Sequence, residues 1–557
     1  EKINTRKAVG RLKVLENLTH GGENMKGTSG IGHTRWATHG APSDINSHPH
    51  MNNAGTIAVV HNGIIENYIP LKKKMQDKGY QFVSETDTEV LAHLLDYYYK
   101  GNPLEAITKV LHRVEGSYAL GIMFADQPDK IFAARKDSPL IVGKSDNGSF
   151  IASDVPAILK YTRTVYYVDN QEVVELQQGS LRFFSVDEEE IEKQPVTIDW
   201  DANAAEKAGY EHFMLKEIYE QPKTINDTIS PRIKDNDIVI EELNMSDEEI
   251  KEITKIHIVA CGSAYHTGVT AKYVIEGLAR IPVEVDVASE FRYRDPILQK
   301  GNMVIVISQS GETADTLAAL RESRERGFKV LGIVNVVGSS IAREADSVMY
   351  TWAGPEIAVA TTKAYSAQLT ALYMLAMKFA GMLTDLRCLP DQIELLLGQK
   401  EKIQHFANRY VGARDIFFIG RGIDYAISLE GSLKLKEISY IHSEAYAAGE
   451  LKHGTISLIE DGTLVVALAT QPDLFQKTIS NMVEVKARGA FVMAVTIEGN
   501  KAIEKASDYV IYIPETNPYF TNSLAIIPLQ LFSYYVAVGR GCDVDKPRNL
   551  AKSVTVE

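Results

Sequence analysis

The chain has 557 residues, of which 45% are hydrophobic and 24% are charged, and its formal net charge is −14. This length exceeds the size at which one hydrophobic core stops growing, so two to four domains are expected. The acidic balance argues against a nucleic-acid partner, and no apolar run approaches the roughly 20 residues that cross a bilayer, so we expect no membrane partner either.

Cysteine usage indicates the compartment. Cys261, Cys388 and Cys542 are widely spaced and form neither a zinc-site pattern nor a disulfide framework, so we expect free thiols and a cytoplasmic location. The sequence begins with EKINTRKAVGRL, which is typical of the interior of a domain. We therefore expect the first domain to be incomplete at its N-terminus.

The first predicted domain covers residues 1–200. Short β-rich runs such as TIAVVH, SYALGIMF and KIFAAR recur between about Gly32 and Phe184, and helical patterns occupy residues 67–78 and 86–99. Runs of this kind predict an α+β layered domain with mostly antiparallel strands.

Two motifs of this domain can carry chemistry. GHTRWATHG offers the guanidinium of Arg35 and an aromatic wall at Trp36, and HNGIIEN offers the pair Asn62-Gly63. A carboxamide N–H beside a backbone N–H on a glycine turn is how an oxyanion hole is built. No cysteine precedes Cys261, so we expect the nucleophile for such a hole to be absent.

Four histidines of the same region, His33, His39, His48 and His50, suggest a metal site as an alternative. They lack the HxxxH spacing of a helix and an adjoining set of acidic ligands. We therefore expect no metal here.

A polar stretch from about Glu188 to Pro222 interrupts the strand rhythm, and we place an interdomain linker at residues 201–245. Beyond it, strands alternate with long amphipathic helices, which predicts parallel α/β units. This half is duplicated, because IHIVACGSAY resembles IFFIGRGIDY and EADSVMYTW resembles KASDYVIYIP. The copies are expected at residues 246–395 and 396–547, followed by a C-terminal tail at 548–557.

The segment MVIVISQSGETADT in the first copy predicts a phosphate cradle. An apolar strand ends in a polar turn and a helix opens at Ala314, whose free N–H groups and positive potential attract an anion. Ser308, Ser310 and Thr313 supply hydroxyl donors, and Gly311 allows close backbone approach. We expect a sugar phosphate as ligand; the alternative is an ordinary turn rich in capping residues. The second copy has TQPD here, so the cradle occurs once.

The second copy carries candidate acid and base groups. Glu430, Lys434 and Glu437 lie at helical spacing and share one face, either as a surface ion pair or, with His453 in a nearby loop, as general acid and base groups acting on a sugar. Lys552, near the end of the chain, is either a solvated lysine or, in a desolvated pocket, an amine that forms a Schiff base with a carbonyl.

The chain resembles the glutamine:fructose-6-phosphate aminotransferase (isomerising) family over essentially its whole length. The resemblance rests on HTRWATHG, HNGIIEN, SETDTE, SQSGETADT, LKLKEISYIHSEAYAAGELKHG and PRNLAKSVTVE, in this order. It implies an αββα glutaminase sandwich of the N-terminal-nucleophile type, here without its N-terminal strand and nucleophile. Two tandem sugar isomerase (SIS) domains with a nucleotide-type α/β fold would follow.

The resemblance also implies the activity. L-glutamine and D-fructose 6-phosphate would give D-glucosamine 6-phosphate and L-glutamate, through glutamine hydrolysis, ammonia channelling, Schiff-base formation and isomerisation. This reaction begins hexosamine synthesis and uses no cofactor. The family forms a homodimer with a shared active site. Without a nucleophile, the chain as written would isomerise or bind a sugar phosphate but not hydrolyse glutamine.

Site roles follow from the matching motifs. In the glutaminase domain the resemblance implies Asn62 and Gly63 in the oxyanion hole, and glutamine bound by Arg35, Trp36, Thr38, His39 and Asp87, with Trp36 gating the ammonia channel. In the isomerase half it implies Lys552 as the Schiff-base lysine, Glu437 as the proton shuttle supported by Lys434, and His453 of a second subunit as the ring opener. The sugar phosphate would contact Ser263, Ser308, Gln309, Ser310, Thr313, Thr361 and Ala551.

Two positions depart from the family pattern: Ala264 stands where a serine is frequent, and Thr361 replaces a serine but keeps a hydroxyl. Both changes are expected to be tolerated. One alternative function is a sugar-phosphate-binding regulator without amidotransferase activity, which would need an effector module that we do not see. Another is a different class II amidotransferase, which would replace the duplicated half with a phosphoribosyl or ATP-pyrophosphatase motif.

Overall fold

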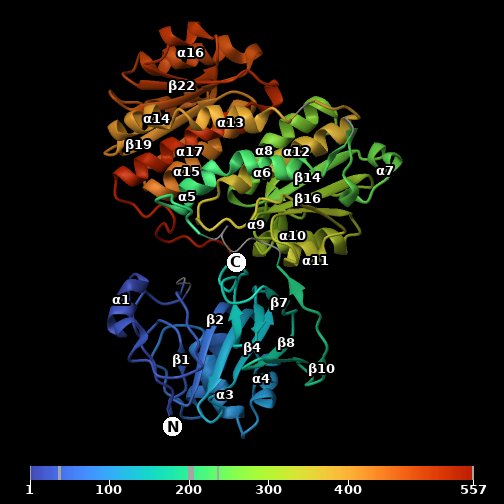
Figure 1. Cartoon of the computed structure of the whole chain (residues 1–557), viewed down its shortest axis with the longest axis vertical. Coiled ribbons are helices and arrows are strands. Elements are labelled where there is room, and N and C mark those ends of the chain that lie inside the picture. Colours follow the sequence, from blue (N-terminus) through green and yellow to red (C-terminus); the bar gives the residue numbers. More distant parts are fainter. Residues whose placement is uncertain (1, 36–38, 199–205, 235–236, 385, 555–557) are drawn as a thin grey trace. The chain divides into compact units, whose positions relative to one another are not determined.

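The computed structural model describes the chain except residues 1, 36–38, 199–205, 235–236, 385 and 555–557. The chain divides into two compact units, one of Glu1–Ala202 with Val554–Glu557 and one of Asn203–Ser553 (Figure 1). Each unit is described by itself below.

The first unit contains two antiparallel sheets. The larger, seven-stranded sheet has the order β1 (His50–Met51), β2 (Ile57–Ile65), β3 (Gly116–Phe124), β4 (Ile131–Lys136), β8 (Glu172–Gln177), β9 (Ser180–Ser185), β10 (Glu190–Ile191). The smaller, four-stranded sheet has the order β11 (Val196–Thr197), β7 (Thr164–Tyr167), β5 (Ile141–Ser145), β6 (Gly148–Ala152). All the strand runs predicted from the sequence form strands.

Helices and the second sheet cover the two faces of the larger sheet. One face packs against α2 (Tyr68–Gln76), α3 (Glu89–Tyr98) and α4 (Pro103–Leu111) through a shared apolar core. The other face packs on the smaller sheet. The outer side of that sheet is covered, among the described residues, by the irregular segment 155–159 in place of a helical layer. The α1 helix (Leu12–Leu18) and η1 (His20–Gly22) precede the sheets.

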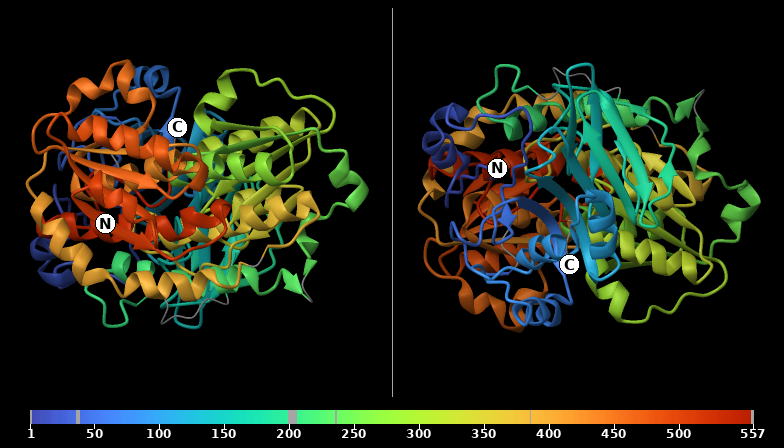
Figure 2. Two further views of the ribbon diagram at one scale, coloured as in Figure 1. Left: turned by 90° about the horizontal axis from the view of Figure 1, so that it is seen from above. Right: turned by 90° about the horizontal axis from the view of Figure 1, so that it is seen from below.

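The second unit contains two parallel five-stranded sheets of identical topology. The first has the order β15 (Val283–Val287), β14 (Lys255–Ala260), β16 (Asn302–Ser308), β17 (Val330–Val334), β18 (Ser347–Tyr350). The second has the order β20 (His442–Ala447), β19 (Asp415–Gly420), β21 (Leu464–Ala469), β22 (Phe491–Ile497), β23 (Tyr509–Ile513). The shared order confirms the duplication (Figure 2, left, orange beside green).

Helices lie between and around these two sheets. Four of them, α8, α12, α15 and α17, join the sheets through one continuous apolar core (Figure 1). The helices and 3-10 turns of this unit are α5 (Phe213–Tyr219), α6 (Gln221–Ile229), η3 (Glu241–Leu243), α7 (Asp247–Lys251), α8 (Gly262–Leu278), α9 (Ala288–Tyr293), α10 (Ala314–Glu325), α11 (Ser340–Glu344), α12 (Lys363–Ala380), α13 (Leu389–Leu397), α14 (Lys400–Ala407), η4 (Asn408–Tyr410), α15 (Ile423–Ser439), η5 (Glu450–His453), η6 (Thr455–Leu458), η7 (Pro472–Leu474), α16 (Phe475–Lys486), η8 (Lys501–Lys505), η9 (Pro518–Phe520) and α17 (Thr521–Gly539). A short hairpin of β12 (Ile233–Lys234) and β13 (Asp237–Ile238) follows α6.

The predicted linker at 201–245 needs correction, because most of its described part belongs to the core of the second unit. Met214, Ile218 and Ile225 have no exposed surface and pack in the central apolar cluster. Together with Ile229, these residues have the spacing of one apolar helical face. The sequence prediction overlooked this pattern because a polar run precedes Met214. The two units divide at Ala202. The limits 246–395 and 396–547 for the two copies stay predictions.

One described helix, over Pro518–Gly539, is long and apolar enough to cross a membrane by length and composition. The expectation that no apolar run approaches this length is therefore wrong. The most apolar window of this helix is 89% buried inside the protein, which is typical of a core helix.

Candidate active site

The predicted phosphate cradle lies at the topological switch point of the first copy. In a parallel sheet of this order, ligands bind at the carboxyl ends of the first and third strands, where the direction of the connections reverses. Ser263 is the second residue of α8, which begins shortly after β14, and Ser308 is the last residue of β16. The sheet therefore brings Ser263 to the same edge as the SQSGET turn.

The cradle is organised by its own hydroxyl groups. The Ser308 Oγ lies 2.9 Å from the Thr313 Oγ1 and accepts a hydrogen bond from the Gly311 N–H at 3.0 Å. The Glu312 N–H donates to the Ser310 Oγ at 3.2 Å. Thr313 is the N-cap residue of α10, so the free amides of that helix face the same turn. The arrangement suits an anion with several oxygens.

Gly311 holds the cradle open, so Gly311→Ala is expected to damage it. Its φ is +66°, and an added Cβ would lie 2.0 Å from the Ser339 Oγ. We expect a cost of about 1–3 kcal/mol in the free energy of unfolding and a KM for a sugar phosphate raised at least about tenfold.

Steady-state kinetics and denaturant unfolding measure both effects. The matched control is Gly327→Ala, because Gly327 also has a positive φ of +84°, but a Cβ added there would meet no atom of the described residues within 4 Å. It should lose stability and keep its KM. A Gly311→Ala protein with the wild-type KM would remove this turn from the binding site.

The equivalent place in the second copy is filled by a carboxylate. The strand registers align Ser308, the end of β16, with Ala469, the end of β21. The next residue, Thr470, gives its N–H to Asp424 Oδ2 at 2.9 Å and its hydroxyl to Asp424 Oδ1 at 2.5 Å. Burial raises the pKa of Asp424 to about 6. Asp424 thus occupies the anion position, in agreement with a single cradle.

Lys552 is bound to a buried acid and is not a solvated tail residue. Its Nζ donates to the Glu356 Oε2 and to the Ala358 carbonyl oxygen, both at 2.7 Å. Glu356 is 2% exposed and also accepts from the Thr361 hydroxyl at 3.2 Å. Thr361 therefore lies at the Lys552 site. Ala551, next to Lys552, is half-buried.

The cradle is connected to the Lys552 site through Asn335, by its backbone amide and its side chain. The Asn335 N–H donates to the Gln309 carbonyl oxygen at 3.1 Å, and the Asn335 Nδ2 donates to the Gly354 carbonyl oxygen at 2.7 Å. Gly354 is two residues before Glu356 in the chain. The half-buried Gln309 thus stands at one end of this connection and the Glu356–Lys552 pair at the other.

The predicted acid and base residues of α15 form a buried ion cluster. Lys434 donates to Glu437 and lies 3.5 Å from Glu430, and the side chain of Lys434 is 1% exposed. Burial lowers the pKa of Lys434, but Glu437 and Glu430 more than offset this and raise it above its ordinary value. Glu356 adds to the rise, so this cluster lies near the Lys552 site.

Glu430 links the two copies. Its carboxylate accepts from the Ser263 hydroxyl at 2.9 Å and pairs with the His266 Nδ1 at 2.8 Å, and both of these residues belong to α8. The structure therefore places the predicted ligand Ser263 against the α15 cluster. His453 lies on η5 and is exposed, and no described contact joins it to Lys434, Glu437 or Lys552.

The predicted oxyanion residues of the first unit lie on β2 with a fixed amide orientation. The Arg35 N–H donates to the His33 Nδ1 at 2.9 Å, so the neutral ring carries its proton on Nε2. That Nε2 lies 2.7 Å from the Asn62 Oδ1, which leaves the Asn62 Nδ2 to act as donor to an oxyanion. Burial lowers the pKa of His33, which favours the neutral ring.

Gly63 is required by close packing, and Asp87 lies beside the histidines. The φ of Gly63 is +125°, and an added Cβ would lie 2.2 Å from the Ser117 carbonyl oxygen. Asp87 is 3% exposed, accepts from the Ile65 N–H at 2.8 Å and lies 3.9 Å from the His39 Nδ1.

Arg35 turns toward its own loop. Its Nη2 donates to the carbonyl oxygens of His39 and Gly40, both at 2.7 Å, and Asp87 is near enough to raise its pKa against the stronger lowering by burial. The predicted ligands Trp36 and Thr38 lie outside the described residues.

In a form of the protein that hydrolyses glutamine, Asn62→Ala is expected to lower the kcat of this hydrolysis by about 10²–10³-fold, because one oxyanion donor is lost. Isomerisation of the sugar phosphate should not change, since that site belongs to the other unit. Paired assays of glutamate release and sugar-phosphate conversion measure this. The exposed Asn53→Ala serves as control, and equal glutamate release by both variants would exclude Asn62 from the hole.

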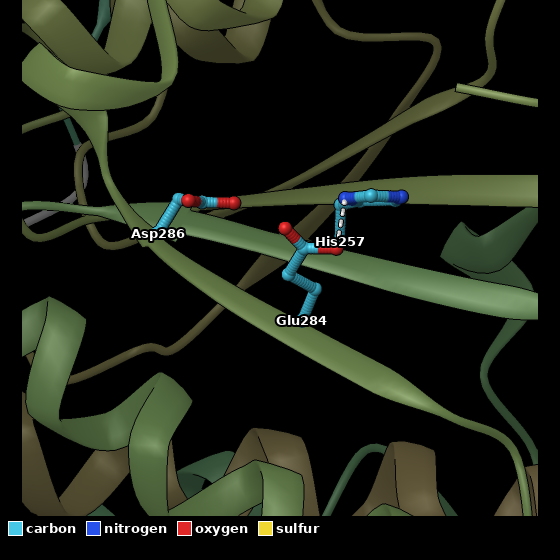
Figure 3. A group of neighbouring side chains, drawn as sticks. All are labelled: His257, Glu284 and Asp286. Atoms are coloured by element: carbon cyan, nitrogen blue, oxygen red, sulfur yellow. Dashed lines mark ion pairs between the residues drawn. The ribbon is translucent and has the colours of Figure 1, made fainter. Parts of the chain in front are cut away.

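One group of described side chains has a geometry compatible with a metal ion: His257 on β14 with Glu284 and Asp286 on β15 (Figure 3). Both ring nitrogens of His257 are buried, and neither has a hydrogen-bond partner among the described residues. However, Lys255 pairs with Glu284, and Arg294 pairs with both carboxylates, at 2.5 Å and 2.8 Å. Two cations thus already balance the two acids, and we assign no metal to this group.

The sequence prediction missed one acid of the isomerase half, because Glu356, the partner of Lys552, was not singled out. Glu430 was predicted as an acid or base candidate, but not its hydrogen bond with Ser263. The signal for Glu356 is weak: a glutamate after Pro355, in an apolar stretch that leads into a helix. A buried glutamate in apolar surroundings needs a cation, and here that cation lies 196 residues away.

Comparisons with known proteins agree with this division. The chain matches the glutamine amidotransferase domain family over residues 33–160 and the SIS domain family over residues 249–378 and 410–540. It is 60% identical to the glutamine–fructose-6-phosphate aminotransferase (isomerizing) of Caldanaerobacter subterraneus subsp. tengcongensis, with 100% of this chain and 93% of that protein covered. For the corresponding Methanosarcina acetivorans protein, the identity is 49% and the coverage 100% and 94%.

A solved structure shows the same fold for the second unit. The C-terminal domain of glucosamine-fructose-6-phosphate aminotransferase from Francisella tularensis superposes with a TM-score of 0.57 and is 40% identical, covering 61% of this chain and 99% of that domain. A glutamine amidotransferase domain is thus followed by two SIS domains. The chain belongs to the glutamine–fructose-6-phosphate aminotransferase (isomerizing) family.

Proposed function

We propose that the protein converts L-glutamine and D-fructose 6-phosphate into D-glucosamine 6-phosphate and L-glutamate. The observation that supports this best is the pairing of Lys552 with a buried acid in the same unit as a single phosphate cradle. A lysine in such surroundings can form an imine with a ketose whose phosphate is held by the cradle. Family membership supplies the choice of substrates.

In the isomerase half, Ser308, Gln309, Ser310 and Thr313 hold the 6-phosphate, with Ser263, Thr361 and Ala551 lining the sugar. Lys552 forms the imine at the ketose carbonyl. Glu437 moves one proton between C1 and C2, and the ammonium group of Lys434 stabilises the developing charge. The contact between Lys434 and Glu437 supports this assignment.

In the glutaminase half, Asp87 binds the amino group of glutamine and Arg35 its carboxylate, next to His39, Trp36 and Thr38. Asn62 and the Gly63 N–H stabilise the oxyanion. The released ammonia then reacts with the ketose. This reaction requires the free electron pair of ammonia, so ammonia must pass between the two half-reactions without being protonated by water. The reaction consists of hydrolysis, imine formation and proton transfers, and it needs no cofactor.

We further propose a cytoplasmic homodimer with a shared site. His453 is exposed and makes no described contact with the residues of its own site, which leaves it available to a second copy. There it would open the furanose ring by proton transfer.

A single incubation tests this function. The purified protein is mixed with fructose 6-phosphate and glutamine, and glucosamine 6-phosphate, glucose 6-phosphate and glutamate are quantified together. Amino sugar with equal glutamate supports the whole proposal. Glucose 6-phosphate alone would restrict it to the isomerase half, and no conversion at all would favour a sugar-phosphate-binding regulator.

A further inference from the structure

A second buried acid lies beside the Lys552–Glu356 pair. Glu217 of α5 is 1% exposed, and its Oε1 accepts hydrogen bonds from the Ile357 N–H at 2.5 Å and the Ala358 N–H at 3.1 Å. Its Oε2 has no hydrogen-bond partner among the described residues. An unpartnered carboxylate oxygen in the interior is costly, and an amide side chain would satisfy the same two N–H groups without a charge.

The backbone at Ala358 joins Glu217 to Lys552. The N–H of Ala358 donates to Glu217, and its carbonyl oxygen accepts from the Lys552 Nζ at 2.7 Å. The same Nζ donates to the Glu356 Oε2 at 2.7 Å. Two buried carboxylates, one bonded to Lys552 and one a peptide unit away, therefore share the field of one ammonium group.

Other charged groups near Glu217 have partners of their own. Lys363 donates to the Glu220 Oε2 at 2.7 Å, and Lys216 lies 3.5 Å from the Glu220 Oε1. Asp545 accepts from the Phe213 N–H and the Met214 N–H at the start of α5, and Lys434, near Glu356, pairs with Glu437. Lys552 is thus the cation that Glu217 and Glu356 have in common.

We infer that Glu356 accepts the ammonium proton of Lys552 when the imine forms, and that Glu217, acting through Glu356, increases the proton affinity of that carboxylate. The inference rests on the proposed function, in which Lys552 is the imine-forming lysine. Glu356 takes one proton, the free amine adds to the ketose carbonyl, and the carbinolamine oxygen leaves as water after the proton returns to it. An ammonium group and a ketone thus give a protonated imine and water, with no net change in protons.

The effect of Glu217 on the proton affinity of Glu356 depends on pH, because it depends on whether Glu217 is ionised. Burial raises the pKa of Glu217 to about 8, and the neighbouring Glu356 carboxylate acts in the same direction, while Lys552 and Lys363 act against it. Below this pH the two acids share one proton. Above it both are ionised, and because Glu217 interacts more strongly with Glu356 than with Lys552, transfer of the Lys552 proton to Glu356 becomes easier.

The test is imine trapping in the Glu217→Gln protein. Glutamine keeps an acceptor oxygen for the Ile357 and Ala358 amides and removes the charge. The protein is incubated with fructose 6-phosphate and cyanoborohydride between about pH 7 and pH 9, and reduced adduct on the Lys552 peptide is measured by mass spectrometry. Because the reductant itself depends on pH, variant and wild type are compared at each pH.

We expect the trapping rate of Glu217→Gln to match that of wild type at the low end of this range. At the high end of the range, the trapping rate of Glu217→Gln should be at least about tenfold lower than that of wild type, while its KM for fructose 6-phosphate should be unchanged. An unchanged ratio across the range would overturn the inference. Absence of any adduct on wild-type Lys552 would instead contradict the proposed function.

Two further variants separate charge from anchoring. Glu217→Asp keeps the charge but shortens the reach to the amides. At the high end of the pH range its trapping rate should therefore stay close to that of wild type. Asp545→Asn removes another buried acid, which binds two amides of α5 and pairs with Lys207, and it should behave as wild type. The inference would be overturned if Asp545→Asn trapped the imine more slowly than wild type at alkaline pH. It would also be overturned if Glu217→Asp trapped it more slowly than wild type at alkaline pH while Glu217→Gln did not.

If the Glu217 variants do not fold, infrared difference spectroscopy of the wild-type protein replaces them. The stretch of a protonated carboxyl should disappear near pH 8. A spectrum without any carboxyl titrating near that pH would overturn the inference.

Discussion

Lys552→Met is expected to abolish the adduct with fructose 6-phosphate and to lower turnover by at least about 10⁴-fold, because the imine-forming amine is removed. The substitution also leaves Glu356 buried without its cation. We therefore expect a loss of up to about 3–5 kcal/mol in the free energy of unfolding at neutral pH. Borohydride trapping, steady-state kinetics and denaturant unfolding measure these three effects.

The stability loss should depend on pH in a defined direction. Burial raises the pKa of Glu356, but Lys552 outweighs it and holds this pKa below the ordinary value of 4.5. A depressed carboxyl pKa gives stability that is present above the unfolded pKa and is lost as pH falls through the folded one. The gap between wild type and Lys552→Met should therefore narrow below about pH 4.5.

Lys363→Met is the matched control, since Lys363 is 3% exposed and is also paired with a glutamate. It should lose stability but keep the adduct on Lys552. A Lys552→Met protein that still forms product at the wild-type rate would remove this lysine from the mechanism.

Glu437→Gln is expected to lower isomerisation by about 10²–10⁴-fold, the contribution typical of a positioned general base. Binding of the sugar phosphate should change little, because the SQSGET turn belongs to the first copy and no hydrogen bond among the described residues joins it to Glu437. Trapping of the Lys552 imine should also persist, so this variant separates imine formation from proton transfer. Turnover, KM and adduct yield, measured on the same preparation, give the three values.

The control is Glu444→Gln on β20, which lies 3.6 Å from the exposed His442. Its turnover should stay within about twofold of wild type, as expected for an exposed ion pair. Wild-type turnover in Glu437→Gln would show that another group moves the proton.

Much of the architecture follows from local pattern. Recurring short β-rich runs predicted the antiparallel strands of the first unit, and the repeated strand and turn motifs predicted two equivalent parallel sheets, which the identical strand order confirms. The linker prediction failed because a polar run hid an apolar helical face beginning at Met214. The membrane-length helix over Pro518–Gly539 was missed because single polar residues interrupt its apolar run.

The sequence alone determined the family, the two kinds of domain and the residues carried by short motifs, such as Asn62-Gly63 and the Ser308–Thr313 turn. These features depend on neighbours within a few residues, whose spacing fixes which side chains share a turn or a helix face. The tertiary structure decided which charges meet: Lys552 with Glu356 across 196 residues, Ser263 with Glu430 across 167, and Asp424 at the vacated anion position. Such pairs form because a buried charge must find a partner wherever packing places one, and no local pattern in the chain encodes that choice.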